Sequence, residues 1–196
     1  MGEMLLGALK PLEWINARLA RLGAILAASA LALMVVVILV QVFCRYVLNS
    51  ALPWPEEAAR FLMLWMTGLA APAVYRRGGF VAIDMLDLAL PPRLSALLSL
   101  LLLIVSGAVL AMALHFGWKH VGSGWLFNSS SLRLPLDLIG MQAMRIKLAW
   151  MYLSLFTGFV LLAMVNAELI LRSLIRLLGH EAALTPIPPV AIAEAE

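Results

Sequence analysis

Charged side chains of both signs gather in residues 43–60, between two apolar stretches of the chain. On a helix, Glu56 can pair with Arg60 four residues on, and Glu57 can pair with the same arginine three residues on. Arg45 ends the preceding apolar stretch and could reach a carboxylate at the start of the next one. These spacings indicate a structural ion-pair hub, in which we expect Arg45 to pair with Glu57 or Glu56.

Aromatic side chains in the same stretch allow a simpler interpretation. Tyr46 and Trp54 lie beside these charges, and Tyr and Trp are enriched where a membrane meets water. Ordinary anchoring at the membrane interface is therefore the alternative to an ion-pair hub.

The other reactive residue types suggest no catalytic centre. The sequence holds three histidines, His115, His120 and His180, and one cysteine, Cys44. They form no metalloprotease motif, and no glycine-rich phosphate loop or pair of histidines at haem depth is present. We expect no enzyme activity, no cofactor and no metal site in this chain.

The composition is that of an integral membrane protein. Of the 196 residues, 64% are hydrophobic and 13% are charged, whereas soluble domains have about 45–50% and about 25%. These values exclude a soluble enzyme domain and a disordered chain. The formal net charge of +3 is too small to indicate a nucleic-acid partner.

Four apolar stretches separated by charges set the expected architecture. A helix needs about 20 apolar residues to cross a membrane. The second stretch reaches that length if the helix begins at Pro55, which suits a first helical turn. We expect an all-α integral membrane protein with one four-helix domain over 1–180 and a disordered tail over 181–196. The expected spans are 22–44, 55–75, 94–118 and 148–167.

An amphipathic segment precedes the first span. Leu12, Ile15, Leu19 and Leu22 share one helical face. The segment is either an N-terminal amphipathic interfacial helix, lying in the plane of the membrane surface, or an extension of the first span. Lys and Arg are more numerous on the side of the N-terminus, so we expect both termini in the cytoplasm.

The centres of the four spans hold no charged residue, which disfavours an ion pathway through this chain. Small residues in the third and fourth spans allow close helix packing. They include Ser106, Ser154 and Gly158. These residues serve either the packing of the four helices on one another or the binding of another membrane protein.

The order of the motifs resembles a known family. Arg45-Tyr46 is followed by Asn49, by Leu52-Pro53-Trp54-Pro55-Glu56-Glu57, by a tryptophan in the second span, by the Arg76-Arg77-Gly78 turn, and by Leu-x-Leu-Pro before the fourth span. The chain is similar to the small membrane subunit, the DctQ-like Q subunit, of tripartite ATP-independent periplasmic (TRAP) transporters. The structural or interface residues that match or adjoin these motifs are Arg45, Asn49, Trp54, Glu56, Glu57, Arg60, Trp65, Arg76, Gly78, Asp84 and Pro135.

This resemblance implies a scaffold subunit in the bacterial inner membrane. It would brace a large membrane subunit that holds the sodium and substrate sites, while a periplasmic binding protein delivers a carboxylate. Membrane lipids would surround the helices. Two alternatives remain: a self-contained small homodimeric transporter, and an assembly subunit of a membrane redox enzyme.

Overall fold

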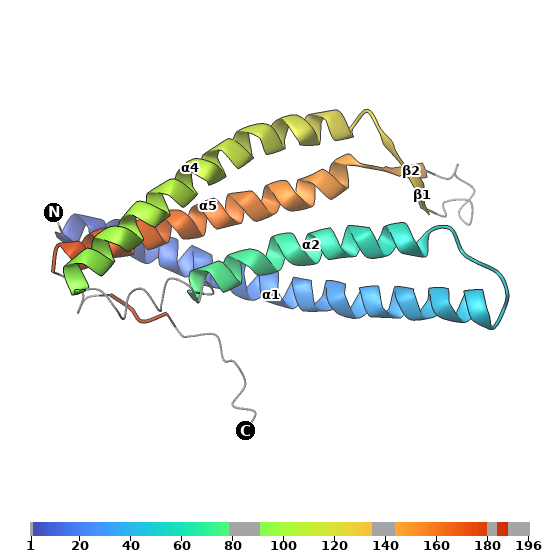
Figure 1. Cartoon of the computed structure of the whole chain (residues 1–196), viewed down its shortest axis with the longest axis horizontal. Coiled ribbons are helices and arrows are strands. Elements are labelled where there is room, and N and C mark those ends of the chain that lie inside the picture. The colour runs from blue at the N-terminus through green and yellow to red at the C-terminus, as the bar shows by residue number, and fades with distance from the viewer. Residues whose placement is uncertain (1, 79–90, 135–143, 180–183, 188–196) are drawn as a thin grey trace, which may run out of the picture.

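The structure is a computed structural model that describes residues 2–78, 91–134, 144–179 and 184–187 (Figure 1). Its helices are α1 (Gly2–Tyr46), α2 (Pro55–Arg76), α4 (Pro92–Gly124) and α5 (Ala149–Leu177). Two strands, β1 (Asn128–Leu134) and β2 (Met144–Lys147), lie between α4 and α5. Within the described residues, four helices are long and apolar enough to cross a membrane. The expected all-α membrane fold is confirmed.

Helices α1, α2, α4 and α5 alternate in direction along a long bundle (Figure 1). The end that holds the α1–α2 link and the strands is called the hairpin end. The end where α2 and α5 finish and α4 begins is called the terminal end. Helix α5 is central because it packs against α4, α2 and the first part of α1, while α1 and α4 form the edges.

The N-terminal segment continues the first membrane helix without a break. Leu9, Asn16 and Gly23 are buried at intervals of seven residues, so one packing stripe runs from this segment into the span. The amphipathic segment is therefore continuous with the first span, as the second alternative states. Its position relative to the membrane surface stays a prediction.

Small residues bring the helices close together. A Cβ atom on Gly68 of α2 would lie 2.5 Å from the backbone oxygen of Ser154 in α5, and one on Gly158 would lie 2.9 Å from the backbone of Gly68. Between α1 and α2, a Cβ on Gly23 would lie 2.7 Å from the backbone oxygen of Leu69. Ser154 and Gly158 thus serve packing within this chain.

Two helices run further than the expected spans. Helix α4 continues to Gly124 and α5 continues to Leu177, so neither Lys119 nor Glu168 ends a helix. The helix α5 can continue past Glu168 because this carboxylate finds partners inside the protein. Where each membrane span ends stays a prediction.

The link after α4 forms an antiparallel hairpin that the sequence did not indicate. Leu134 pairs with Met144 and Asn128 pairs with Lys147, with an irregular register between them. The polar run of Asn and Ser residues in β1 lacks the alternation of apolar and polar residues that identifies a half-buried strand. Its partners lie elsewhere in the fold, as described below.

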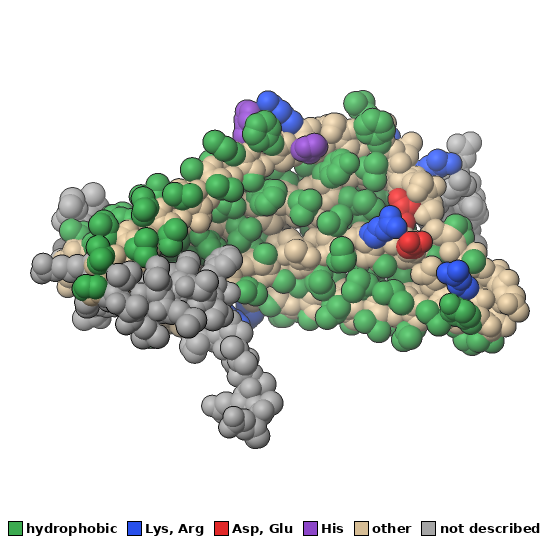
Figure 2. Space-filling model, in the orientation of Figure 1, with side chains coloured by type: hydrophobic (Ala, Val, Ile, Leu, Met, Phe, Trp, Pro, Cys, Tyr) green, Lys and Arg blue, Asp and Glu red, His purple; other side chains and the backbone are tan. Residues whose placement is uncertain are grey.

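Large apolar side chains cover the outside of the bundle. Figure 2 shows hydrophobic side chains along the length of one face, with acidic and basic side chains together near the hairpin end. Leu39 of α1 and Met112 of α4 are 61% and 64% exposed. Exposing so large an apolar surface to water is energetically unfavourable, so the protein is a multi-pass membrane protein.

Candidate functional site

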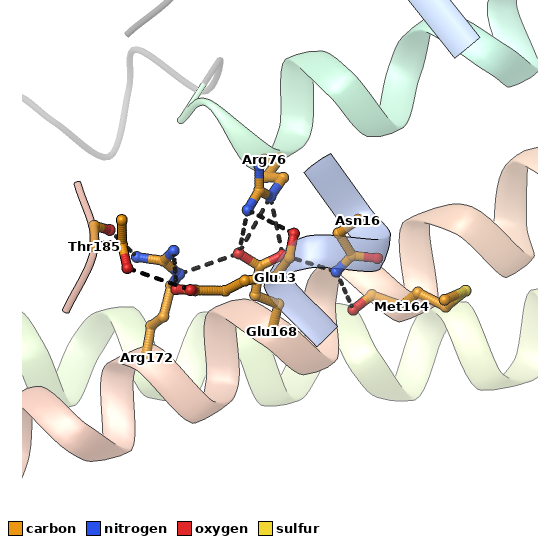
Figure 3. Close-up of polar contacts among 7 residues, drawn as sticks. All are labelled: Glu13, Asn16, Arg76, Met164, Glu168, Arg172 and Thr185. Atoms are coloured by element: carbon orange, nitrogen blue, oxygen red, sulfur yellow. Dashed lines mark hydrogen bonds and ion pairs between the residues drawn. The ribbon is translucent and has the colours of Figure 1, made fainter. Parts of the chain in front are cut away.

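A buried carboxylate organises the terminal end of the bundle (Figure 3). Glu168 of α5 is fully buried. The guanidinium of Arg76, the last residue of α2, donates to both of its oxygens, with Nη2 2.8 Å from Oε1 and Nε 2.9 Å from Oε2. Asn16 of α1 donates from Nδ2 to Oε2 at 2.7 Å, and Arg172 donates from Nε to Oε1 at 3.1 Å. One side chain therefore connects α1, α2 and α5.

A second carboxylate completes this group. Glu13 of α1 pairs through Oε1 with Nη2 of Arg172. The third nitrogen of Arg172, Nη1, donates to the backbone oxygen of Thr185 at 2.8 Å, so the segment after α5 is joined to the same group. We call Glu13, Asn16, Arg76, Glu168 and Arg172 the terminal cluster. Its two carboxylates balance its two guanidiniums, and its hydrogen bonds join α1, α2, α5 and the segment after α5.

A neutral hydrogen-bonded chain lies beside the terminal cluster. Tyr75 donates its hydroxyl to Oδ1 of Asn166 at 2.6 Å. Asn166 donates from Nδ2 to the backbone oxygen of Leu103 at 3.1 Å. These bonds connect α2, α5 and α4, so all four helices are joined at this end by buried polar contacts.

Glu57 has the corresponding role at the hairpin end. Its Oε1 accepts from the hydroxyl of Ser129 at 2.6 Å, and its Oε2 accepts from the backbone N–H of Ser131 at 2.7 Å. The backbone N–H of Leu132 and the hydroxyls of Ser130 and Ser131 also donate to Oε2. We call Glu57 with these four residues the hairpin cluster. It explains the serine run, whose donors surround one carboxylate.

The prediction that Arg45 pairs with Glu57 or Glu56 is wrong. Among the described residues no ion pair joins Arg45 to Glu56 or Glu57, and its guanidinium lies 5.9 Å from the ring centre of Tyr46. Helices α1 and α2 cross at Gly23 and Leu69. Counted from this crossing, Arg45 lies ten residues further along the bundle than Glu57, which is about 15 Å. Figure 1 shows α1 extending past the start of α2 at this end.

The expected ion pair between Glu56 and Arg60 is present. Nη2 of Arg60 lies 3.0 Å from Oε1 of Glu56, with the two side chains 70% and 69% exposed. An exposed pair of this kind contributes about 0.3–0.5 kcal/mol. Neighbours in the sequence thus differ: Glu56 lies on the surface, while Glu57 connects two elements.

The remaining candidates occupy separate places. Asn49 has a φ of 49° in the α1–α2 link, and Gly78 has a φ of 74° after α2, so both turn the chain. Trp54 lies at the N-cap position of α2. The indole of Trp65 contacts Phe61, and its Nε1 has no hydrogen-bond partner among the described residues. Asp84 and Pro135 lie outside the described residues.

Sequence reasoning missed most of the terminal cluster. Of its five members, only Arg76 was a candidate. The available signal was the spacing of Glu168 and Arg172, which are four residues apart in an otherwise apolar helix. Glu13 and Asn16 carried no local signal, since their partners lie about 150 residues away in the chain.

The described residues offer no evident metal site. No three of their His, Cys, Asp or Glu side chains lie close enough together to hold a metal ion. That this chain needs no cofactor stays a prediction.

Comparison with known proteins identifies the family. Residues 34–176 match the family model described as tripartite ATP-independent periplasmic transporters, DctQ component. The chain is also similar to a Haemophilus influenzae protein whose name describes it as a candidate TRAP transporter small permease protein. The two are 35% identical over 68 residues, which make up 35% of this chain and 42% of that relative. Because the family match extends from the last third of α1 to the last turn of α5, the protein belongs to the DctQ component family of TRAP transporters.

Proposed function

We propose that this chain is the small scaffold subunit of a sodium-coupled TRAP transporter. It braces a large membrane subunit that takes up an organic acid, a carboxylate, delivered by a periplasmic binding protein. The observation that carries the proposal is the family match over residues 34–176. The sodium and substrate sites belong to the large subunit, and this chain holds no cofactor.

The internal contacts support a bracing role. The terminal cluster joins α1, α2 and α5, and the hairpin cluster joins α2 to β1. Between these ends, Gly68 and Gly158 hold α2 and α5 in backbone contact. A bundle fixed at its middle and at both ends resists relative motion of its helices, which is what a support for a moving partner requires.

The outer surface supports a large apolar partner. The edge helices α1 and α4 carry long rows of exposed apolar side chains, such as Leu26 and Val36 on α1 and Leu101 and Val109 on α4. Lipid tails and the apolar helices of a membrane protein fit such a surface equally well. We assign the contact with the large subunit to one of these two edges.

The location belongs to the same proposal. We place the protein in the bacterial inner membrane with both termini in the cytoplasm, so that the terminal end is cytoplasmic and the hairpin end is periplasmic. The excess of Lys and Arg on the side of the N-terminus supports this orientation.

Purification from the native host tests the proposal. With an affinity tag on the full chain, a much larger multi-span TRAP subunit should copurify in constant proportion. Proteoliposomes that contain this complex and the binding protein should show sodium-driven carboxylate uptake, and liposomes that contain this chain alone should show none. Coupled uptake by the chain alone, or purification without a large subunit, would reject the scaffold role.

A further inference from the structure

A row of basic side chains on the outside of α1 takes no part in the role proposed above. Lys10, Arg18 and Arg21 are exposed, and Trp14 between them is 57% exposed. Successive helical residues are turned by about 100°, so these four side chains lie within about 80° of the circumference of α1. We call Lys10, Trp14, Arg18 and Arg21 the basic stripe.

The positive charges of the basic stripe are not neutralised by the part of the chain that the structure describes. Among the described residues, no ion pair includes Lys10, Arg18 or Arg21. The guanidinium of Arg18 stacks on Trp14, with Cζ 3.9 Å from the ring centre, and such a contact leaves the positive charge in place. Glu13, the nearby carboxylate of α1, is already paired within the terminal cluster. The stripe therefore presents three positive charges to its surroundings.

The basic stripe ends where an exposed apolar surface of α1 begins. Leu22 and Ile25 follow Arg21 on the same side of the helix and are 57% and 58% exposed. The uncharged run 22–44 rises about 34 Å, which is enough to cross about 30 Å of hydrocarbon. We therefore expect Arg18 and Arg21 at the edge of the hydrocarbon, where long cationic side chains reach the lipid headgroups.

The chemistry of this surface fits an anionic amphiphile. The cations require a negative charge from outside the described chain, and the apolar side chains that follow them require hydrocarbon. Clusters of Lys and Arg next to a membrane helix attract anionic lipids, and a tryptophan such as Trp14 suits the membrane interface. An anionic phospholipid supplies the phosphate and the hydrocarbon in one molecule.

We propose that the basic stripe binds the headgroup of an anionic phospholipid in the adjoining leaflet. The phosphate lies between Arg18 and Arg21, and the acyl chains lie along Leu22 and Ile25. Lys10 is about 16 Å further along the helix than Arg21, so it adds to the positive field without contacting the same phosphate. The bound lipid fixes the depth of α1 in the membrane.

Native mass spectrometry of the full chain with added phosphatidylglycerol or phosphatidylcholine tests this site. Arg18→Gln and Arg21→Gln should each weaken retention of phosphatidylglycerol about fivefold, which corresponds to about 1 kcal/mol for one cation near an anionic lipid. Neither should alter retention of phosphatidylcholine. Replacing both arginines by lysine keeps the charge and should keep the preference for phosphatidylglycerol. Arg145→Gln removes an exposed cation at the hairpin end and is the matched control, so it should leave retention unchanged.

Four results would overturn the proposal. The first is equal retention of the two lipids by the unsubstituted chain. The second is an equal loss in Arg145→Gln, which would indicate attraction to overall charge. The third is displacement of phosphatidylglycerol by soluble glycerol phosphate, which would indicate an anion site without a role for acyl chains. The fourth is unchanged retention in Arg18→Gln and Arg21→Gln with weaker copurification of another membrane protein, which would assign the stripe to a protein contact.

Unfolding does not confuse this test. The side chains of Arg18 and Arg21 are exposed, so the glutamine variants should keep the melting temperature of the unsubstituted chain in detergent. A loss of lipid retention at an unchanged melting temperature then reports on the binding surface itself.

Discussion

Individual acidic residues of this protein differ sharply in what their surroundings require of them. An ionised carboxylate in an apolar bundle is tolerated only when charges and donors surround it. Glu168 meets two guanidiniums and an amide. Glu57 meets hydroxyls and backbone N–H groups. Glu56 meets one exposed arginine and water. The stability effect of removing each charge should follow this order of enclosure.

Glu168→Gln should destabilise the protein strongly. Among the described residues, the substitution leaves Arg76 with no carboxylate partner and Arg172 with Glu13 as its one remaining carboxylate. Removing one partner of a buried ion pair costs about 3–5 kcal/mol, which corresponds to a fall in melting temperature of about 10 °C. Thermal unfolding of the purified chain in detergent measures this change.

Glu56→Gln is the matched control for that measurement. It makes the same chemical change in an exposed pair, so the melting temperature should fall by less than about 2 °C. Equal effects of the two substitutions would show that the burial of Glu168 does not govern stability.

At the scale of elements, the stability of the β1–β2 hairpin depends on Glu57, a residue of helix α2. The backbone N–H of Ser131 donates to Oε2 of Glu57 at 2.7 Å. The backbone N–H of Leu132 is shared between Oε2 of Glu57 at 3.2 Å and the hydroxyl oxygen of Ser129 at 2.9 Å. A hydrogen bond to a charged group contributes about 1.5–3 kcal/mol. Glu57→Ala should therefore speed amide hydrogen exchange at Ser131 by about tenfold or more, and at Leu132 by less, because the hydroxyl oxygen of Ser129 still accepts from Leu132. Peptide-level exchange over 128–134 measures it, and unchanged rates there would contradict the role of Glu57.

The crossing of α2 and α5 should tolerate no side chain at Gly68. Ala favours a helix over Gly by about 1 kcal/mol, yet a Cβ here would lie 2.5 Å from a backbone oxygen. Gly68→Ala should therefore lower the melting temperature, because separating the helices costs about 1–3 kcal/mol. Gly122→Ala in α4 meets nothing within 4 Å and should not lower it. A stabilised Gly68→Ala variant would show that the two helices can separate freely.

The elements that the sequence predicted are those with local signals. Pro55 and the acids after it mark the start of α2, and the helix begins there. The fourth span was predicted to end at Ala167, because Glu168 looks like the edge of an apolar stretch until its partners on α1 and α2 are known, whereas the helix α5 continues to Leu177. The prediction of an ion pair for Arg45 was wrong because the number of residues in the link between α1 and α2 does not tell how far α1 extends past the start of α2. The hairpin was not predicted because the hydrogen-bond donors of its serine run bind Glu57 and do not form a regular ladder between two strands.

At the scale of the whole molecule, polar contacts and apolar surface are segregated. The polar contacts described above turn inward toward α5 or lie at the two ends of the bundle, whereas α1 and α4 present apolar edges. Long-range pairs, such as Asn16 with Glu168, create this division. Composition predicts that a membrane protein results, but only the fold shows which charges are enclosed.

The described contacts of Glu57 favour a scaffold over an ion pathway, because donors of this chain occupy both of its oxygens. In the assembled transporter that we propose, Glu57→Gln should lower the yield of complex, since the hairpin cluster is weakened. It should leave the number of sodium ions moved per carboxylate unchanged, because both oxygens of Glu57 are occupied by donors of this chain. Flux ratios in proteoliposomes, normalised to assembled complex, measure this, with Glu56→Gln as the variant that should alter neither quantity. A changed ratio in Glu57→Gln at normal assembly would place this carboxylate on the ion path and end the case for a purely supporting subunit.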